Sequence, residues 1–365
     1  MTASFTHLMR SSIEIKNTYT SKSIDSINFV YIRTLKYNNS SDKRRMINWL
    51  IFSWRVSRLF KFIGDKPDVV IVSSPSLVSF LGARSLANRF KSKLIFDVRD
   101  IWPLALVELG GFSIKNPFIR VMQWLEVMAY QHSDVVSSSL PCAIEHMEAH
   151  GMKRNKFLYL PNGFNKEELL NKDKLEDFFS SQIPKNKFVV GYVGSLGLAN
   201  AMSILLKAAK LLNSDKSIVF VIVGKGNELK NLKSQVKSLN LINVVFIDSV
   251  PKKQVQSVIQ LFDVCYIGWL EKSGYKFGIS PQKLPEYLFS GKPIIHSYSG
   301  RGCVVKEANA GISVPAEDHV AIKNAIIQLQ GMTSYDRGKL GENGKKYSMR
   351  HYDYKNIAKS LESVF

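Results

Sequence analysis

Short apolar runs alternate with longer amphipathic segments along most of the chain. Runs rich in Val, Ile and Phe predict strands at 68–74, 93–100, 134–139, 156–163, 188–196, 218–226, 243–250, 263–269, 292–298 and 310–314. Segments 201–213 and 228–240 have helical spacing. Because the strand runs are continuous rather than alternating, they favour parallel sheets covered on both faces. The pattern predicts an α/β fold with two Rossmann-like doubly wound parallel-sheet domains that face each other across a cleft.

A polar, charged stretch at 165–187 separates the two sets of strands and sets the domain boundaries. We expect domains at 1–164 and 165–340, and a C-terminal helix at 341–365 that packs back toward the first domain. The opening segment "ASFTHL" has the pattern of a strand's tail and the loop after it. One βα unit of roughly 30 residues is therefore expected to be missing from the first domain.

The net charge of +20 indicates an anionic partner, and residues 1–100 hold 17 Lys and Arg against 7 Asp and Glu. The segment 43–66 mixes these cations with tryptophan and phenylalanine, which suits the headgroup layer of an anionic membrane. An ordinary helix with a solvated basic face is the equal alternative. Nucleic acid is not expected, because no nucleic-acid-binding motif accompanies the charge.

The compartment follows from three negative observations. No apolar run is long enough to cross a bilayer, and the polar N-terminus is no secretory signal. The three cysteines share no metal-ligand spacing and form no disulfide framework. We expect a cytoplasmic protein, bound peripherally to the inner face of the cytoplasmic membrane if segment 43–66 binds lipid.

The first candidate site follows the strand at 188–196. Gly194, Ser195 and Gly197 precede a helix, so backbone amides and a helix end are available to the phosphates of a nucleotide. A purely structural glycine turn is the alternative. The turn "VGKGNEL" after the next strand lacks the third glycine of a dinucleotide fingerprint and favours a structural role.

The second candidate site is the segment 275–295. Its prolines and Gly291 predict a helix at 282–290. Glu286 then lies near the first turn, where an ionised carboxylate can accept hydrogen bonds from both ribose hydroxyls. Lys283 and the amides around Ser280 lie at the same end, where a diphosphate could bind. A charge-capped surface helix is the alternative.

The third candidate is "FDVRDIWP", in which Arg99 and Asp100 directly follow a buried strand and Trp102 forms a wall beside them. This charge pair is a functional candidate, and a salt bridge that fixes the loop is the alternative. His146 and His150 have the spacing of two zinc ligands, but Met147 occupies the position where the metalloprotease pattern has glutamate. We expect no metal site.

Five motifs in this order resemble the GT-B retaining glycosyltransferases of family 4, in the bacterial branch that builds O-antigen and capsule. They are "FDVRDIWP", "LPNGFN", "GYVGSLGLANAM", "GISPQKLPEYLFSGKPII" and "YDYKNIAKSL". The resemblance implies that the C-terminal domain binds a nucleotide sugar, usually a UDP-sugar, without cofactor or metal. It implies that the N-terminal domain binds the acceptor, often a sugar on a polyprenyl diphosphate.

The chain departs from the wider family at the diphosphate site. Ser195 and Asn200 stand where that family carries an arginine and a lysine, and Gly278 stands where it carries a second glutamate. Lys283 is the candidate replacement cation. Contacts with the donor sugar would fall to backbone amides from Gly278 through Ile279 to Ser280.

The predicted function is transfer of a sugar, with retention of anomeric configuration, from a nucleotide-diphosphate sugar to a glycan or a polyprenyl-diphosphate-linked acceptor. Lys283, Ser195 and Gly197 are assigned to the diphosphate and Glu286 to the ribose. Arg99 and Asp100 are assigned to the acceptor or donor-sugar side. The alternatives are a truncated, inactive relative and a nucleotide-sugar epimerase with the same fold.

Overall fold

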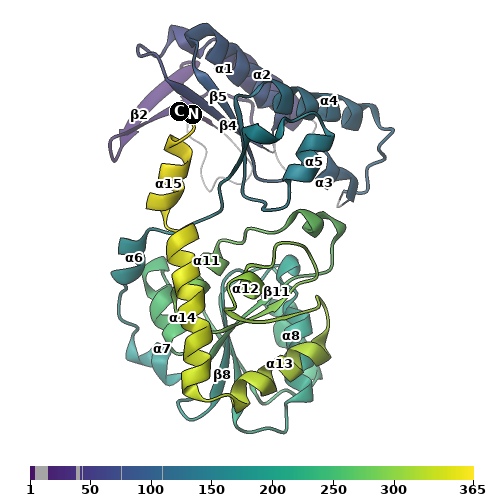
Figure 1. The fold of residues 1–365 in the computed structure, drawn as a ribbon, viewed down its shortest axis with the longest axis vertical. Coiled ribbons are helices and arrows are strands. Elements are labelled where there is room, and N and C mark those ends of the chain that lie inside the picture. The colour runs from purple at the N-terminus through teal and green to yellow at the C-terminus, as the bar shows by residue number, and fades with distance from the viewer. Residues whose placement is uncertain (5–14, 38–41, 43, 75, 109) are drawn as a thin grey trace. The chain divides into compact units, whose positions relative to one another are not determined.

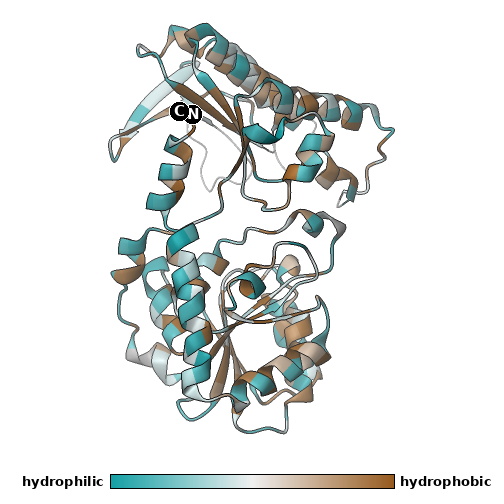
Figure 2. Ribbon diagram, in the orientation of Figure 1, coloured by the Kyte–Doolittle hydropathy of each residue, from teal (hydrophilic) through white to brown (hydrophobic). Residues whose placement is uncertain are grey.

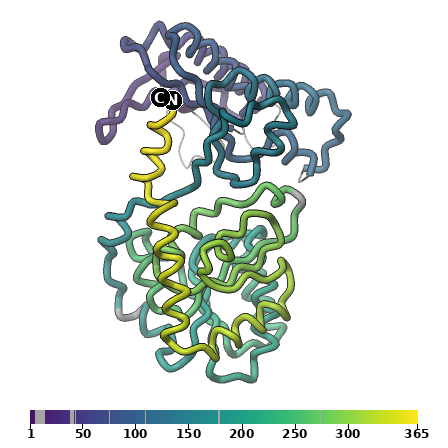
Figure 3. The backbone as a smooth tube through the Cα atoms, in the orientation of Figure 1, coloured from purple at the N-terminus to yellow at the C-terminus, as the bar shows by residue number. Residues whose placement is uncertain are grey.

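The computed structural model describes the chain except for residues 5–14, 38–41, 43, 75 and 109. The chain divides into two compact units (Figures 1 and 3). The first comprises Met1–Tyr159 with Val364–Phe365, and the second comprises Leu160–Ser363.

The second unit is built on a six-stranded parallel sheet. Its strands are β8 (Phe188–Val193), β9 (Ile218–Val223), β10 (Val244–Ile247), β11 (Val264–Gly268), β12 (Ile294–Ser297) and β13 (Gly311–Val314). The order is β10-β9-β8-β11-β12-β13, which is the doubly wound arrangement with the first strand in the middle. The six strands predicted from 188 to 314 are confirmed.

Alternate strand residues of this sheet face two separate cores. Val189, Val221 and Cys265 pack with helices on one face, whereas Val190, Phe220 and Tyr266 pack with helices on the other. Figure 2 shows the strands as a brown, apolar layer. Covering both faces explains why the strand runs are continuously apolar.

The helices of the second unit, with its short 3-10 turns (η), are named here once. They are α6 (Lys166–Leu170), α7 (Asp177–Ser181), η3 (Leu198–Asn200), α8 (Met202–Leu211), α9 (Leu229–Ser238), η4 (Lys252–Gln254), α10 (Val255–Gln260), η5 (Ser273–Phe277), α11 (Lys283–Phe289), α12 (Val304–Glu307), α13 (His319–Gly331), α14 (Ser334–His351) and α15 (Tyr354–Glu362). The helices predicted at 201–213, 228–240 and 282–290 are confirmed as α8, α9 and α11. The C-terminal segment 341–365 holds the end of α14 and all of α15, and α14 packs against α11.

The first unit holds two sheets. The parallel sheet β4 (Val69–Ser73), β5 (Lys93–Val98), β6 (Val135–Ser138) and β7 (Phe157–Tyr159) confirms the four strands predicted from 68 to 163. The second sheet has the order β1-β3-β2, from β1 (Thr2–Ala3), β2 (Tyr19–Ile24) and β3 (Ile27–Ile32). The hairpin of β2 and β3 was not predicted. Of the "ASFTHL" segment, Phe5–Leu8 lies outside the described residues.

The helices and 3-10 turns of the first unit are α1 (Arg44–Ser57), η1 (Leu59–Lys61), α2 (Leu77–Phe90), α3 (Leu104–Glu108), α4 (Pro117–His132), α5 (Ile144–Ala149) and η2 (Arg154–Lys156). Helices α1, α2 and α4 lie side by side in one layer (Figure 1). Among the described residues, no helix is both long enough and apolar enough to cross a membrane.

Tyr287 connects α11 to β8 in the core of the second unit. Its buried hydroxyl accepts a hydrogen bond from the Val193 amide at 2.7 Å and donates one to the Val193 carbonyl at 3.0 Å. These bonds fix the second turn of α11 against the end of β8.

We predict that Tyr287→Phe lowers the free energy of unfolding of the second unit by about 1–3 kcal/mol, because both buried backbone groups of Val193 lose their partner. Urea unfolding monitored by circular dichroism measures the change. Tyr335→Phe is the matched control, since the Tyr335 side chain on α14 is exposed. Equal stability of the two variants would contradict the assignment of these bonds.

Candidate functional site

Two glycine loops meet at the carboxyl edge of the six-stranded sheet. Gly194 follows β8 and Gly224 follows β9, and a Cβ built on Gly224 would overlap the carbonyl oxygen of Gly194. Backbone bonds join the loops, from Gly194 N to Val223 O at 3.0 Å and from Leu196 N to Lys225 O at 2.9 Å. Glycine is required at position 224 because the two main chains touch there.

A cavity of about 290 Å³ opens at this edge. It is lined by the loops after β8, β9 and β10 and by the start of α10. The lining residues are Val193, Gly194, Ser195, Val223, Gly224, Lys225, Ser249, Val250 and Val255. Ligands of doubly wound sheets bind at this position relative to the strands.

Lys283 ties the helix α11 to the glycine loop after β8. Its Nζ donates to the Tyr192 hydroxyl at 2.7 Å and to Asn200 Oδ1 at 2.5 Å. Both partners bond in turn to the Ser195 carbonyl, Tyr192 Oη at 2.5 Å and Asn200 Nδ2 at 3.0 Å. A Cβ built on Gly194 would lie 3.5 Å from Lys283 Nζ, so the ammonium group lies beside this glycine.

The environment of Lys283 disfavours its charge. Burial lowers the pKa of the Lys283 ammonium from 10.5 to about 7, because the group loses water and its hydrogen-bond partners are neutral oxygens. Burial also raises the pKa of the Tyr192 phenol, so this hydroxyl stays a donor to Ser195 O. An anion bound beside Gly194 would favour the protonated, charged form of Lys283.

Glu286 lies one turn beyond Lys283 on α11 and on the same face of that helix. The residue is 8% exposed, and its carboxylate pairs with the ammonium of Lys252, whose side chain is 66% exposed. Lys252 comes from the 3-10 turn after β10 and was not singled out in the sequence. The pair therefore joins a buried carboxylate to an exposed cation.

The loop before α11 is also held in place. Asn162 donates from Nδ2 to the Ser280 carbonyl at 2.5 Å, and its backbone amide donates to Ser280 Oγ at 3.2 Å. Gly278 has φ of 87°, a conformation that favours glycine, and Ile279 is buried. The "LPNGFN" motif thus positions the predicted sugar-binding loop, a role that sequence reasoning did not assign.

The first unit places its candidate residues at the carboxyl edge of the β4–β7 sheet, around a residue that sequence reasoning missed. Asp97 accepts hydrogen bonds from Ser73 Oγ and Ser137 Oγ, both at 3.0 Å. Arg99 Nε donates to Asp97 at 2.9 Å, so the guanidinium pairs with Asp97. The assignment of Arg99 and Asp100 to the acceptor or donor-sugar side stays a prediction.

Asp100 and Trp102 lie in the loop after β5. Ser74 Oγ accepts bonds from the amides of Arg99 at 2.9 Å and Asp100 at 3.3 Å, which fixes the loop. Burial raises the pKa of the Asp100 carboxyl above its ordinary value. Trp102 packs edge-on against Trp49 of α1, with ring centroids 6.1 Å apart.

The rings of His146 in α5 and of His150, which caps this helix, lie tilted with centroids 4.1 Å apart, and Glu126 of α4 lies beside them. Both carboxylate oxygens of Glu126 accept bonds, Oε1 from Tyr130 Oη and His146 Nε2 at 2.9 Å, Oε2 from Gln123 Nε2 at 2.6 Å. The contacting carboxylate comes from another helix than His146. These hydrogen bonds hold Gln123, Tyr130 and His146 around the buried carboxylate of Glu126.

Two known protein families match the chain, one mainly in the first unit and one in the second. Residues 32–163 match the glycosyl transferase 4-like domain, and residues 173–347 match the glycosyl transferases of group 1. Among solved structures, Anabaena Alr3699/HepE in complex with UDP superposes with a TM-score of 0.66 at 15% identity, covering 91% of this chain and 85% of that one. The chain has the GT-B fold.

A second GT-B structure is titled trehalose-6-phosphate from E. coli bound with UDP-2-fluoro glucose. It superposes with a TM-score of 0.73 at 10% identity, covering 96% of this chain and 89% of that one. The E. coli protein named as colanic acid biosynthesis glycosyl transferase WcaI is 23% identical over 247 residues, 66% of this chain and 60% of its own length.

An uncharacterized glycosyltransferase of Methanocaldococcus jannaschii, MJ1069, is 27% identical over 184 residues, 50% of this chain and 45% of its own length. The chain thus spans about half the length of these curated relatives.

We predict that the second unit becomes more stable as pH rises from about 7 toward 10, through Lys283. Its folded pKa is about 7 and its unfolded pKa about 10.4, so the unfolded state binds more protons in this window and the cost of burying the charge disappears. The contribution is at most about 1.4 kcal/mol per pH unit. Lys283→Met should lack it, as measured by urea unfolding between pH 7 and 9.5. Parallel pH profiles for the two proteins would exclude the effect.

Proposed function

We propose that this GT-B protein is a retaining glycosyltransferase that uses a nucleotide-diphosphate sugar, with UDP as the nucleotide. The acceptor is a glycan or a polyprenyl-diphosphate-linked sugar in surface polysaccharide synthesis. The observation that carries the proposal is the partly buried ammonium of Lys283, which lies beside Gly194 and lacks a carboxylate partner among the described residues.

The diphosphate is assigned to the edge formed by the glycine loop and Lys283. Lys283 contacts Asn200, which occupies the position of the wider family's lysine. The ammonium group of α11 therefore lies beside the position where the wider family has a lysine in the glycine loop. The backbone amides of Ser195 and Gly197 are assigned to the same diphosphate. A buried cation facing neutral oxygens gains most from a dianionic ligand, because Coulomb interactions strengthen where water is excluded.

The ribose is assigned to Glu286. Its carboxylate is held by burial, and its present partner Lys252 is a surface side chain that can move aside or contact the nucleotide itself. The sugar contacts fall to the main chain from Gly278 to Ser280, which Asn162 fixes. This arrangement supports a nucleotide-sugar donor.

Chemically, the acceptor hydroxyl forms its bond to the anomeric carbon on the face from which the nucleotide diphosphate leaves. The bond from that carbon to the diphosphate oxygen breaks, and the hydroxyl proton passes to the departing diphosphate. Lys283 stabilises the negative charge that develops on the departing diphosphate, and the residues around Asp97, Arg99 and Asp100 position the acceptor. No metal or other cofactor is assigned a role in this step. The reaction rate then depends on positioning and electrostatics.

The relatives support this assignment. Structures of HepE are titled as complexes with UDP, with UDP and glucose, and with UDP-glucose. WcaI is named for colanic acid biosynthesis, and a 25% identical Bacillus subtilis relative, TuaH, for teichuronic acid biosynthesis. A UDP-sugar donor and a cell-surface polysaccharide product fit both sets of names.

We assign contact with an anionic membrane to the outer face of α1. Met46, Leu50 and Trp54 follow one another at four-residue spacing, and each is about half exposed. The Arg58 guanidinium lies 3.9 Å from the centroid of the Trp54 ring. Exposed apolar side chains flanked by arginines suit the headgroup layer, so the acceptor's lipid would be reached from the cytoplasmic side.

Glu286→Ala is expected to weaken binding of UDP by about 10- to 100-fold, because the ribose hydroxyls lose charge-assisted hydrogen bonds of about 1.5–3 kcal/mol. Isothermal titration calorimetry measures the affinity, and Glu342→Ala on α14, also a loss of one carboxylate, is the control. Unchanged affinity in Glu286→Ala would remove the ribose assignment. Incubation with a panel of UDP-sugars and a lipid-linked acceptor tests transfer, and the anomeric coupling constant of the product tests retention.

The double variant Leu50→Ala/Trp54→Ala is expected to reduce binding to vesicles of anionic phospholipid by at least about fivefold, because two interfacial anchors are lost. Co-sedimentation measures the bound fraction. Ile242→Ala/Ile327→Ala removes two exposed apolar side chains from the second unit and is the control. Equal binding of both variants, or binding to neutral vesicles alone, would refute the membrane assignment.

A further inference from the structure

Three side chains with metal-ligating atoms meet between α4 and α5 in the first unit. One such atom from each of Glu126, His146 and His150 lies within 4.8 Å of the others. Glu126 comes from the middle of α4, His146 from the first turn of α5, and His150 from the residue that caps α5. Two imidazoles and one carboxylate form a known ligand set of zinc sites that have three protein ligands. The fold thus adds a third ligand to the histidine pair.

The expectation of no metal site depended on Met147, which has no bearing on metal binding itself. In the metalloprotease pattern the glutamate after the first histidine is the general base of hydrolysis, whereas the two histidines are the ligands. Met147 therefore removes that base and leaves both ligands in place. Sequence reasoning missed the third ligand because Glu126 lies 20 residues from His146 and on another helix. With Glu126 in position, we depart from that expectation.

Hydrogen bonds already orient these ligands. His150 Nδ1 lies 2.7 Å from His146 O, and because a carbonyl oxygen only accepts, Nδ1 carries the proton. In the neutral ring, Nε2 of His150 then holds the lone pair that a metal ion requires. Glu126 Oε2 accepts from Gln123 Nε2 at 2.6 Å, and Oε1 accepts from Tyr130 Oη at 2.9 Å. Outer contacts of this kind are typical of metal-ligating histidines and carboxylates.

The burial of Glu126 favours a cation at this place. The Glu126 side chain is 1% exposed and that of His146 is 10% exposed. Within the part of the chain that the structure describes, no lysine or arginine pairs with Glu126, and its hydrogen bonds come from Gln123, Tyr130 and His146. An ionised carboxylate out of water is costly without a positive charge beside it, and a divalent ion would supply that charge.

The contact between His146 and Glu126 is close to the spacing of two zinc ligands. His146 Nε2 lies 2.9 Å from Glu126 Oε1. With metal–ligand distances of about 2.0–2.1 Å, two ligand atoms of a tetrahedral zinc ion lie about 3.3 Å apart. A zinc ion can replace the proton between these two atoms if they separate slightly and the ring proton of His146 moves to Nδ1. His150 is partly exposed at the end of its helix, so its ring can turn toward the same point.

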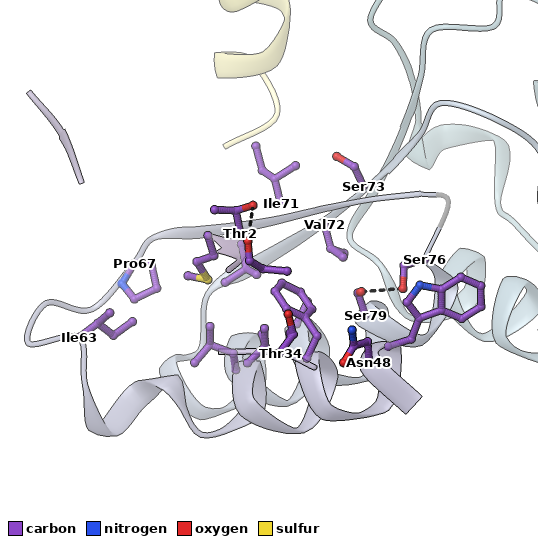
Figure 4. Close-up of a pocket in the computed structure, with 18 of the residues that line it drawn as sticks. Thr2, Thr34, Asn48, Ile63, Pro67, Ile71, Val72, Ser73, Ser76 and Ser79 are labelled. Atoms are coloured by element: carbon purple, nitrogen blue, oxygen red, sulfur yellow. Dashed lines mark hydrogen bonds between the residues drawn. The ribbon is translucent and has the colours of Figure 1, made fainter. Parts of the chain in front are cut away.

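A cavity of about 520 Å³ beside β4 in the same unit offers a contrast (Figure 4). Its described lining residues include no histidine, cysteine or carboxylate. Its polar side chains bond to protein groups, Asn48 Nδ2 to Leu35 O at 2.6 Å and Ser79 Oγ to Ser76 Oγ at 2.9 Å. This cavity therefore offers no ligand set to a metal ion, whereas the cluster at Glu126 does.

We propose that Glu126, His146 and His150 bind one zinc ion, with water in the fourth position of a tetrahedral site. Two imidazoles and a carboxylate suit zinc better than magnesium or calcium, which prefer oxygen ligands. The ion would join α4 to α5, the helix that follows β6. Its role is structural, because none of the residues assigned to the donor or the acceptor belongs to this cluster.

The test titrates zinc into the full chain, freed of metal with a chelator, by isothermal titration calorimetry. One zinc ion per chain is expected to bind with a Kd of about 1 µM or tighter. His150→Ala removes one ligand, leaves the hydrogen bonds of Glu126 in place, and should weaken binding by about tenfold or more. His132→Ala is the matched control, because His132 is an exposed histidine at the end of α4, and it should bind like wild type.

Cobalt(II) in place of zinc reports on the ligands of the wild-type chain and needs no variant. We expect the visible absorption of four-coordinate cobalt with nitrogen and oxygen ligands. Zinc should also raise the midpoint of thermal unfolding in wild type and leave that of His150→Ala unchanged. Circular dichroism checks that both variants are folded.

Three results would overturn the proposal. They are the absence of zinc binding in the micromolar range, equal affinities of His150→Ala and His132→Ala, and a thiolate-to-cobalt absorption band, which would assign the metal to a cysteine. None of these readouts depends on donor binding or transfer.

Discussion

The burial of one ammonium group constrains the whole carboxyl edge of the second unit. Lys283 lies against the neutral oxygens of Tyr192 and Asn200, and the free energy of removing its charge from water appears as a strongly lowered pKa. Such a group persists only where the surrounding structure holds it. Here Tyr287 fixes α11 to the end of β8, and the Ser195 carbonyl holds both of the lysine's partners. Helix, strand and glycine loop thus form one rigid unit around a cation that its surroundings leave uncompensated.

The strands of both parallel sheets could be predicted from sequence because each is a short apolar run set by local pattern. Helix α11 was predicted for the same kind of reason, since prolines and a glycine mark its ends. Its charged residues then follow from helical geometry alone. The limit appears where a side chain's partner lies far away in sequence. Glu286 was identified, but Lys252 was not, because nothing near residue 252 indicates that its turn lies over α11. Asp97 was read as part of a strand, although it holds Arg99 and two serines.

The first unit was harder to predict from sequence, because its elements also depend on contacts between residues far apart in the chain. In the β2–β3 hairpin, β2 is mostly polar and gave no signal, whereas the apolar run of β3 was missed although Val30 and Ile32 are buried. Helix α1 packs one face inward, as the ordinary-helix interpretation expects, and membrane contact stays a prediction. Ser53 and Val56 pack inward, Ser53 accepting a bond from the Gly82 amide at 2.9 Å, while other apolar side chains of the same helix remain exposed. The sequence predicts that α1 is an amphipathic helix, but only the fold determines which of its apolar side chains stay exposed.

The cavity beside Gly194 and Gly224 has a floor and a wall that are built from different loops. The floor beside the ammonium group is main chain, and its position is set by the ladders of β8 and β9 rather than by any side chain. The remaining wall, at Ser249 and Val250, is side chain and belongs to a different loop. Substitutions in that wall can change the shape offered to a ligand while the main-chain floor stays the same. A single scaffold of this kind can therefore diverge in ligand choice without rebuilding the part that meets the charge.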